Sequence, residues 1–205
     1  MTISTYAELK TAITNWFMDR SDVGTSYGDE IIDLAEAYFN LNLRVREMET
    51  VDDLEPDVDS ICTLPTDFIE AQRVVELASI RRPLEFLTPE MVDEWYPDRA
   101  GGLACHYTIV GEELTVFPMS SNDIELTYWA EIPALSGSQT TNWLLTKSPN
   151  LYLHTCLMYA AEFAKDQAQF VQEAALVARF VELINAAGQR AKFGNAAVTQ
   201  RGPTP

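Results

Sequence analysis

The sequence predicts an α+β protein, in which a mainly helical bundle is interrupted by a small antiparallel β-sheet. Apolar residues recur at helical spacing near both ends of the 205-residue chain, whereas the middle alternates apolar and polar residues as half-buried strands do. With 47% hydrophobic and 22% charged residues, the composition is that of a globular protein long enough to bury a core. The order helices, sheet, helices favours the α+β class.

Helices are expected over about residues 5–50. The first begins at a capping box, Thr5-Tyr6-Ala7-Glu8, and a second follows a break at residues 22–28. The acidic residues toward the start of the second helix complement its dipole, and we expect their face, which includes Glu36, to be exposed to solvent. The stripe expected to face the core of this second helix consists of Ile31, Leu34, Tyr38, Leu41, Val45 and Met48.

A β-rich insertion is expected over about residues 60–132, after an acidic connector at residues 52–59. Thr88-Pro89 is typical of the start of a short helix that ends near Tyr96. The clearest strand covers residues 123–132, where apolar and polar side chains alternate. Further strands or extended pieces are expected at 60–64, 72–77 and 81–86, with a hairpin at 106–110 and 113–117.

The C-terminal part is expected to form an antiparallel helical hairpin over residues 148–187. Ser148 as N-cap and Pro149 at the first helical position mark the start of a helix that runs to about Lys165. Because this helix is apolar on several sides, it must be covered on more than one face, by the chain's own core or by other copies of the chain. Residues 188–205 are expected to be an extended tail, so that residues 1–187 make a single domain. The last helix is expected to present Phe170, Ala174, Val177, Val181 and Ile184 on one face.

The formal net charge of −17 is unusually acidic and is unevenly distributed. Residues 1–60 hold 14 acids and 4 bases, residues 61–148 hold 13 and 5, and residues 149–205 hold 4 and 5. Proteins that bind DNA neutralise its phosphates with Lys and Arg, so this balance argues against nucleic-acid binding. It does not argue against nucleic acid passing nearby, because an acidic surface repels a polyanion without holding it.

The sequence contains no G-x-S-x-G, P-loop or G-x-G-x-x-G motif, and His106 and His154 lack the spacing of a helical metal site. We therefore expect no enzyme activity, no cofactor and no metal. The three cysteines, Cys62, Cys105 and Cys156, indicate buried thiols in a reducing compartment rather than disulfides. The longest stretch without formal charge has 15 residues, fewer than the ~20 that a membrane helix needs, so no membrane partner is expected.

A series of short motifs follows one another across residues 60–165 in the order of a known family. In this order, the series resembles the head-to-tail adaptor proteins of tailed bacteriophages, also called connector or tail accessory proteins. The motifs include Leu64-Pro65-Thr66-Asp67-Phe68, Arg82-Pro83-Leu84-Glu85-Phe86, Tyr107-Thr108-Ile109-Val110-Gly111, Leu114-Thr115-Val116-Phe117-Pro118, Thr141-Asn142-Trp143-Leu144-Leu145 and Ser148-Pro149-Asn150-Leu151-Tyr152.

The resemblance implies a structural protein of the virion, located in its neck or tail and assembled in the host cytoplasm. Members of the family form a ring, usually dodecameric, beneath the portal protein and extend the DNA channel toward a downstream tail or nozzle protein. DNA is then expected to pass through without specific binding. The alternatives left open are a small acidic peptidoglycan hydrolase and a protein-interaction module that forms no ring.

Two sets of site residues go with the adaptor interpretation. The end of the family's chain commonly reaches the portal, and the over-apolar helix suits contacts between subunits of a ring. The candidate portal contacts are Arg190, Lys192, Phe193 and Arg201. The candidate subunit-interface residues are Trp143, Leu151, Tyr152, Leu157 and Tyr159.

Overall fold

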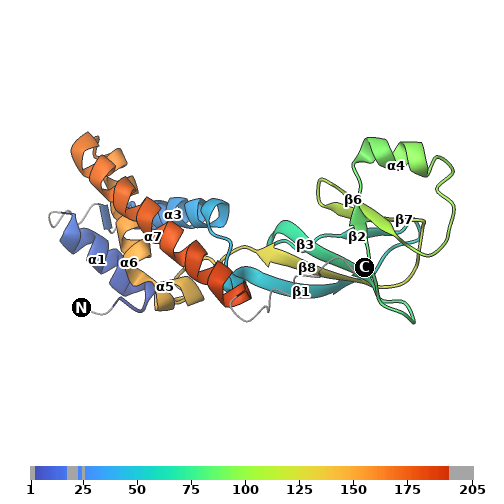
Figure 1. Cartoon of the computed structure of the whole chain (residues 1–205). Coiled ribbons are helices and arrows are strands. Elements are labelled where there is room, and N and C mark those ends of the chain that lie inside the picture. The colour runs from blue at the N-terminus through green and yellow to red at the C-terminus, as the bar shows by residue number, and fades with distance from the viewer. Residues whose placement is uncertain (1–2, 18–22, 25, 194–205) are drawn as a thin grey trace, which may run out of the picture. The chain divides into compact units, whose positions relative to one another are not determined.

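The computed structural model describes residues 3–17, 23–24 and 26–193, with the backbone alone for residues 192 and 193. The chain divides into two compact units (Figure 1). The helical unit consists of Met1–Glu47 and Ile132–Pro205, and the β unit consists of Met48–Glu131. The β unit is therefore inserted between the two parts of the sequence that make the helical unit. The expected α+β fold class is confirmed.

Among the helices whose bounds the structure describes, two N-terminal and three C-terminal ones belong to the helical unit. The antiparallel hairpin predicted near the C-terminus is present, and residues 164–166 join its two helices. A short helix before the hairpin was not predicted. The helices of this unit are α1 (Tyr6–Trp16), α3 (Gly28–Asn42), α5 (Trp143–Lys147), α6 (Pro149–Phe163) and α7 (Gln167–Phe193), and the turn η1 (Arg46–Met48) leads into the β unit.

Local capping explains where several helices begin. The capping box predicted at Thr5 is present, since the Thr5 hydroxyl accepts from the Glu8 N–H and the Glu8 carboxylate accepts from the Thr5 N–H. Asn142 caps α5 by accepting a hydrogen bond of 2.8 Å from the Leu145 N–H. Ser148 occupies the predicted N-cap position of α6, but its side chain makes no capping hydrogen bond. Its backbone ends α5 instead, because the Ser148 N–H donates to the Leu144 carbonyl.

The predicted inward stripe of the second helix was partly wrong: Ile31, Val45 and Met48 are buried as predicted, but Val45 and Met48 follow the end of α3 at Asn42. The face that packs into the unit consists of Ile31, Ile32, Ala35, Glu36 and Phe39, whereas Leu34 and Leu41 are exposed. Two apolar stripes fit helical spacing on this helix, and only the one centred on Ala35 meets the other helices. Glu36, expected on the solvent face, is buried.

The last helix continues past its predicted end at Ala187 and reaches Phe193, so residues 188–193 are not part of a tail. Glycine at position 188 is typical of a helix end, but here it lies inside the helix against Val45. A Cβ at Gly188 would lie 3.1 Å from Val45 Cγ1, so glycine allows close approach of α7 to the chain after α3. The predicted inward face of α7 is confirmed, with Val177 fully buried at its centre.

The β unit contains two four-stranded sheets rather than one. One sheet has the order β1-β8-β3-β4 and the other β2-β7-β6-β5. All their pairings are antiparallel except β5 with β6. The strands are β1 (Glu49–Leu54), β2 (Ile61–Thr63), β3 (Phe68–Glu76), β4 (Arg82–Pro83), β5 (Glu85–Phe86), β6 (His106–Val110), β7 (Glu113–Phe117) and β8 (Ile124–Ala130), and the helix is α4 (Pro89–Trp95).

The two sheets share one core. It draws side chains from both, for example Leu126 and Tyr128 of β8 and Leu114 and Val116 of β7. The alternation predicted for residues 123–132 is confirmed in β8, whose even-numbered residues are buried. The acidic connector was partly wrong, because residues 49–54 form β1 and pair with β8. Within the described residues, no helix is long and apolar enough to cross a lipid bilayer.

Candidate interaction surfaces

The net charge of the chain is almost confined to the β unit. Residues 48–131 hold 19 acids and 4 bases, a balance of −15. The helical unit holds the remaining 12 acids and 10 bases, a balance of −2. Counting along the sequence could not show this division, because the helical unit combines a moderately acidic start of the chain with a slightly basic end. The fold therefore separates a strongly anionic unit from a nearly neutral one.

Helix α6 is covered by its own chain. Of its 15 residues, nine are buried, and its neighbours are α1, α3, α5 and α7 of the same unit. Four helices of one unit thus provide the cover that the sequence required on more than one face.

The five candidate subunit-interface residues divide into two groups. Leu151, Tyr152 and Leu157 are buried inside the helical unit, so their side chains form its core. Trp143 and Tyr159 are partly exposed. Of the five candidates, only these last two present surface to another molecule in the described fold.

A buried polar network fixes α6 against α3 and the chain before α5. The Glu36 carboxylate accepts from the Leu135 N–H at 2.8 Å and from the Tyr152 hydroxyl at 3.0 Å. The Asn142 side-chain amide donates to the same Tyr152 oxygen at 2.7 Å and to the Pro133 carbonyl at 2.8 Å. Burial raises the pKa of Glu36 above its usual range, although the two hydrogen bonds it accepts oppose the shift. The network holds together segments that lie about a hundred residues apart.

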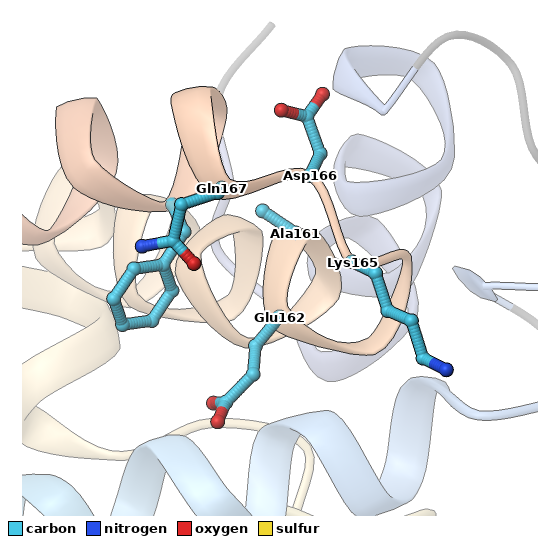
Figure 2. Close-up of a pocket in the computed structure, with 6 residues that line it drawn as sticks. Ala161, Glu162, Lys165, Asp166 and Gln167 are labelled. Carbon is cyan, nitrogen blue, oxygen red and sulfur yellow. The ribbon is translucent and has the colours of Figure 1, made fainter.

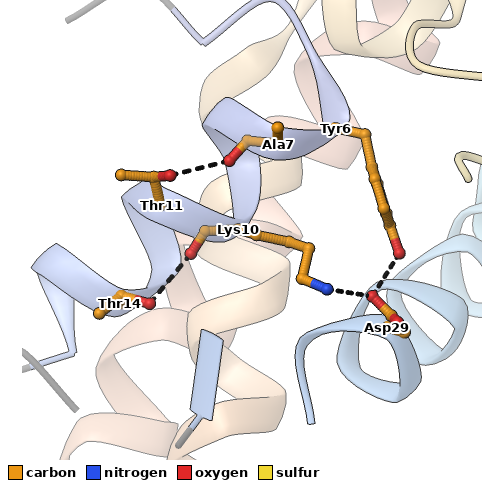
Figure 3. Close-up of polar contacts among 6 residues, drawn as sticks. All are labelled: Tyr6, Ala7, Lys10, Thr11, Thr14 and Asp29. Atoms are coloured by element: carbon orange, nitrogen blue, oxygen red, sulfur yellow. Dashed lines mark hydrogen bonds and ion pairs between the residues drawn. The ribbon is translucent and has the colours of Figure 1, made fainter. Parts of the chain in front are cut away.

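Figure 3 shows how α1 is held to the start of α3. Asp29 Oδ1 accepts a hydrogen bond from the Tyr6 hydroxyl and forms an ion pair with Lys10 at 2.5 Å. These two donors lower the pKa of the Asp29 carboxyl, Lys10 having the larger effect. Burial and the hydrogen bond to Asp29 raise the pKa of Tyr6. The contact is structural, because each group already has its partner.

A hollow of about 230 Å³ lies at the turn between α6 and α7. In Figure 2 the side chains of Glu162, Lys165 and Asp166 point in different directions, so their charged groups do not converge on a ligand position. Asp166 Oδ1 already accepts from the N–H groups of Ala168 and Gln169, at 3.1 Å each, and so caps α7. The hollow follows from the geometry of the turn and does not indicate a binding site.

A groove of about 320 Å³ runs between α5 and the end of α7. Trp143 and Leu144 line it from α5, and Ala187 and Ala191 line it from α7. At its edge, Lys147 forms an ion pair with Glu47, and this hydrogen bond lowers the pKa of the Glu47 carboxyl. Among the residues predicted to contact another subunit, Trp143 is therefore placed beside the helix end that was predicted to contact the portal.

The histidines and cysteines have structural surroundings. His106 Nδ1 lies 2.7 Å from the Tyr96 hydroxyl, and His154 Nδ1 lies 2.7 Å from Glu173 Oε2. All three cysteines are free thiols, and burial followed by nearby carboxylates raises the pKa of Cys62 to about 11. No group of three His, Cys, Asp or Glu side chains in the described part of the chain is placed to hold a metal ion.

The candidate portal contacts lie at the end of α7 and beyond it. Arg190 is exposed on the helix, and its Nε donates to the Ala186 carbonyl at 3.3 Å. Lys192 and Phe193 belong to the last turn of α7. Arg201 lies outside the described residues. Arg190, Lys192 and Phe193 are thus presented by a helix, where the sequence was taken to form a tail.

A protein-family model described as SU10 adaptor protein matches residues 4–201. The chain belongs to this family. The match spans the helical unit and the β unit, so it covers the whole fold described above. None of the curated proteins matches the chain.

Membership of the SU10 adaptor family confirms the resemblance to phage head-to-tail adaptors. It assigns this chain a structural role in the bacteriophage particle, at the neck of the virion, in association with other head and tail proteins. The family is a structural one.

Proposed function

We propose that this SU10 adaptor forms a ring, dodecameric as in related adaptors, beneath the portal, and that it extends the DNA channel toward the tail. The helical unit forms the body of the ring, and the β unit presents acidic surface to the DNA path. The observation that carries the proposal is the division of charge, −15 on the β unit against −2 on the helical unit. An anionic wall repels phosphates, so DNA slides past it without specific binding.

The ring is tested by the oligomeric state of the purified chain, alone and with its cognate portal protein. Native mass spectrometry and electron microscopy are expected to show a closed ring in at least one of the two conditions. A chain that remains monomeric in both would contradict the proposal and leave an interaction module without a ring.

The channel role is tested with duplex DNA. We expect no shift of a labelled duplex at physiological salt, because the chain has few bases to neutralise phosphates. A gel shift at micromolar protein would contradict a passage that does not bind DNA. A matched control is the full chain with four exposed acids changed to Lys, Asp52, Asp53, Glu55 and Asp59, which makes this stretch of the β unit locally basic and is expected to raise its affinity for DNA above that of the wild type.

The portal contact is assigned to the end of α7 and the residues that follow it. Changing Arg190 and Lys192 to Glu is expected to weaken portal attachment while leaving the fold intact. A chain ending after Phe193 tests Arg201 without disturbing α7. Truncation before Gly188 is not a clean test, because Gly188 packs against Val45. Trp143 and Tyr159 remain the candidates in α5 and α6 for contact with a neighbouring subunit. We further propose that the ring assembles in the host cytoplasm and that a tail or nozzle protein binds below it.

A further inference from the structure

Helix α3 carries a strip of exposed residues on the face opposite its buried one. Glu30, Leu34, Ala37 and Leu41 follow one another at spacings of four, three and four residues, so they share one helix face. The two leucines are 50% and 78% exposed. A single exposed leucine is ordinary, but leucines seven residues apart along one face are typical of helices that pack on a partner.

Helix α7 carries a second strip with the same spacing. Gln172, Leu176, Arg179 and Leu183 are all exposed and lie opposite the buried face of α7 centred on Val177. The two leucines are 39% and 52% exposed. Glu182, one residue before Leu183, points about 100° away around the helix, so the charge within this strip is the Arg179 guanidinium.

The two strips complement each other in shape and in charge. When the leucine pairs are placed against each other, in either helix orientation, the small Ala37 faces the long Arg179 side chain. The α3 strip is acidic through Glu30, whereas the α7 strip is basic through Arg179. Leucines then meet leucines, and the Glu30 carboxylate lies about two turns along the contact from the Arg179 guanidinium.

We infer that the α3 strip of one copy packs on the α7 strip of the next copy, which makes the contact between neighbouring subunits. The inference rests on the proposed ring and specifies its interface. A contact between two α3 strips or between two α7 strips would join copies only in pairs and could not close a ring, and two α7 strips would also bring Arg179 against Arg179. Contact between unlike strips leaves one strip of each kind free at every step, so assembly proceeds head to tail, as closure of a ring requires.

The inference is tested with two double variants. Leu34→Glu with Leu41→Glu disables the α3 strip, and Leu176→Glu with Leu183→Glu disables the α7 strip. Each variant alone is expected to lose assembly under the conditions in which the wild type forms rings. An equimolar mixture is expected to stop at a dimer with one copy of each variant, because only one intact pair of strips remains. Native mass spectrometry of the mixture measures this directly.

The controls separate failure of this interface from failure of the ring. Val58→Glu with Ile80→Glu places the same change on exposed residues of the β unit and is expected to assemble like the wild type. Circular dichroism checks that each variant is folded, and Arg179→Glu offers a milder second variant that is expected to weaken assembly.

If the wild type forms rings and both leucine variants do too, or if the mixture forms full rings, the interface is wrong and the proposed function stands. If the wild type forms no ring on its own or on the portal, the proposed function itself fails.

Discussion

The helical unit and the β unit each bury apolar residues, but they differ in what they present to their surroundings. The β unit carries a balance of −15, and its exposed apolar side chains are scattered over turns and element ends, such as Val58, Ile80 and Trp95. The helical unit is nearly neutral, and its exposed leucines recur along α3 and α7. An acidic surface repels DNA phosphates and so suits a channel that must not bind DNA, whereas repeated exposed leucines suit a contact with a neighbouring subunit. The comparison indicates that the β unit serves the DNA passage and the helical unit serves assembly.

The largest effect is expected from a cavity in either core, which tests whether the units are independent. Phe39 is fully buried, with its ring 4.9 Å from that of Tyr152, and Leu126 is fully buried in β8. Phe39→Ala is expected to lower the free energy of unfolding of the helical unit by about 3–5 kcal/mol, and Leu126→Ala that of the β unit by about 2–5 kcal/mol. Hydrogen exchange should show the loss of protection confined to the unit that carries the change.

Leu41→Ala provides the matched control in the helical unit. It shortens a leucine two residues from Phe39, but this leucine lies on the exposed face of α3. We therefore expect the free energy of unfolding to change by less than about 0.5 kcal/mol. Equal losses of protection in both units after Phe39→Ala would show that the two units unfold together.

A smaller effect is expected from the buried network around Glu36. Glu36→Leu leaves the Leu135 N–H without its acceptor and removes the acceptor of the Tyr152 hydroxyl, at a cost of about 2–3 kcal/mol. Glu36→Gln keeps an oxygen acceptor and, at a pH below the ordinary pKa of Glu36, is expected to unfold at a temperature close to that of the wild type. Thermal melts followed by circular dichroism compare the two variants. Equal destabilisation by Leu and Gln would show that the hydrogen bonds do not matter.

The same residue makes stability depend on pH. Because the pKa of Glu36 is raised in the folded chain, the folded chain keeps a proton that the unfolded chain has already released. The contribution of Glu36 to stability is therefore full below its ordinary pKa and is lost as the pH rises through the raised value. Relative to the wild type, Glu36→Gln should gain stability across that window and hold a constant difference above it. A difference that is flat with pH would contradict the raised pKa.

Local patterns predicted those parts of the fold that local interactions determine. The capping box at Thr5, the short helix after Thr88 and the alternation of β8 all depend on residues close together in the sequence, and all three are present. The failures have distant causes. Gly188 continues a helix because Val45 lies against it, and residues 49–54 form a strand in spite of their acidity because β8 offers a partner.

The candidate surfaces were predicted less well for a similar reason. Leucines at helical spacing in α3 look the same whether they face the core or a neighbour, and the burial of Ala35 and Phe39 decides between the two. Likewise, the apolar character of α6 predicted many contacts without identifying the partners. The charge division between the units also needed the fold, because it depends on which segments join in one unit.

The smallest effect on stability is expected when one surface ion pair is removed from each unit. Arg81 pairs with Glu125 in the β unit, and Lys147 pairs with Glu47 in the helical unit. Glu125 also lies directly across the β1–β8 ladder from Asp53, so Arg81 offsets a repulsion between like charges that Lys147 does not face. Arg81→Gln is expected to cost about 0.5–1 kcal/mol and Lys147→Gln less than about 0.5 kcal/mol, by chemical denaturation in urea at low salt. Because these interactions lie at the surface, the difference between the two variants should disappear in about 1 M NaCl. If instead Lys147→Gln costs as much as Arg81→Gln, or if the difference persists in salt, the acidity of the β unit does not set the strength of its ion pairs.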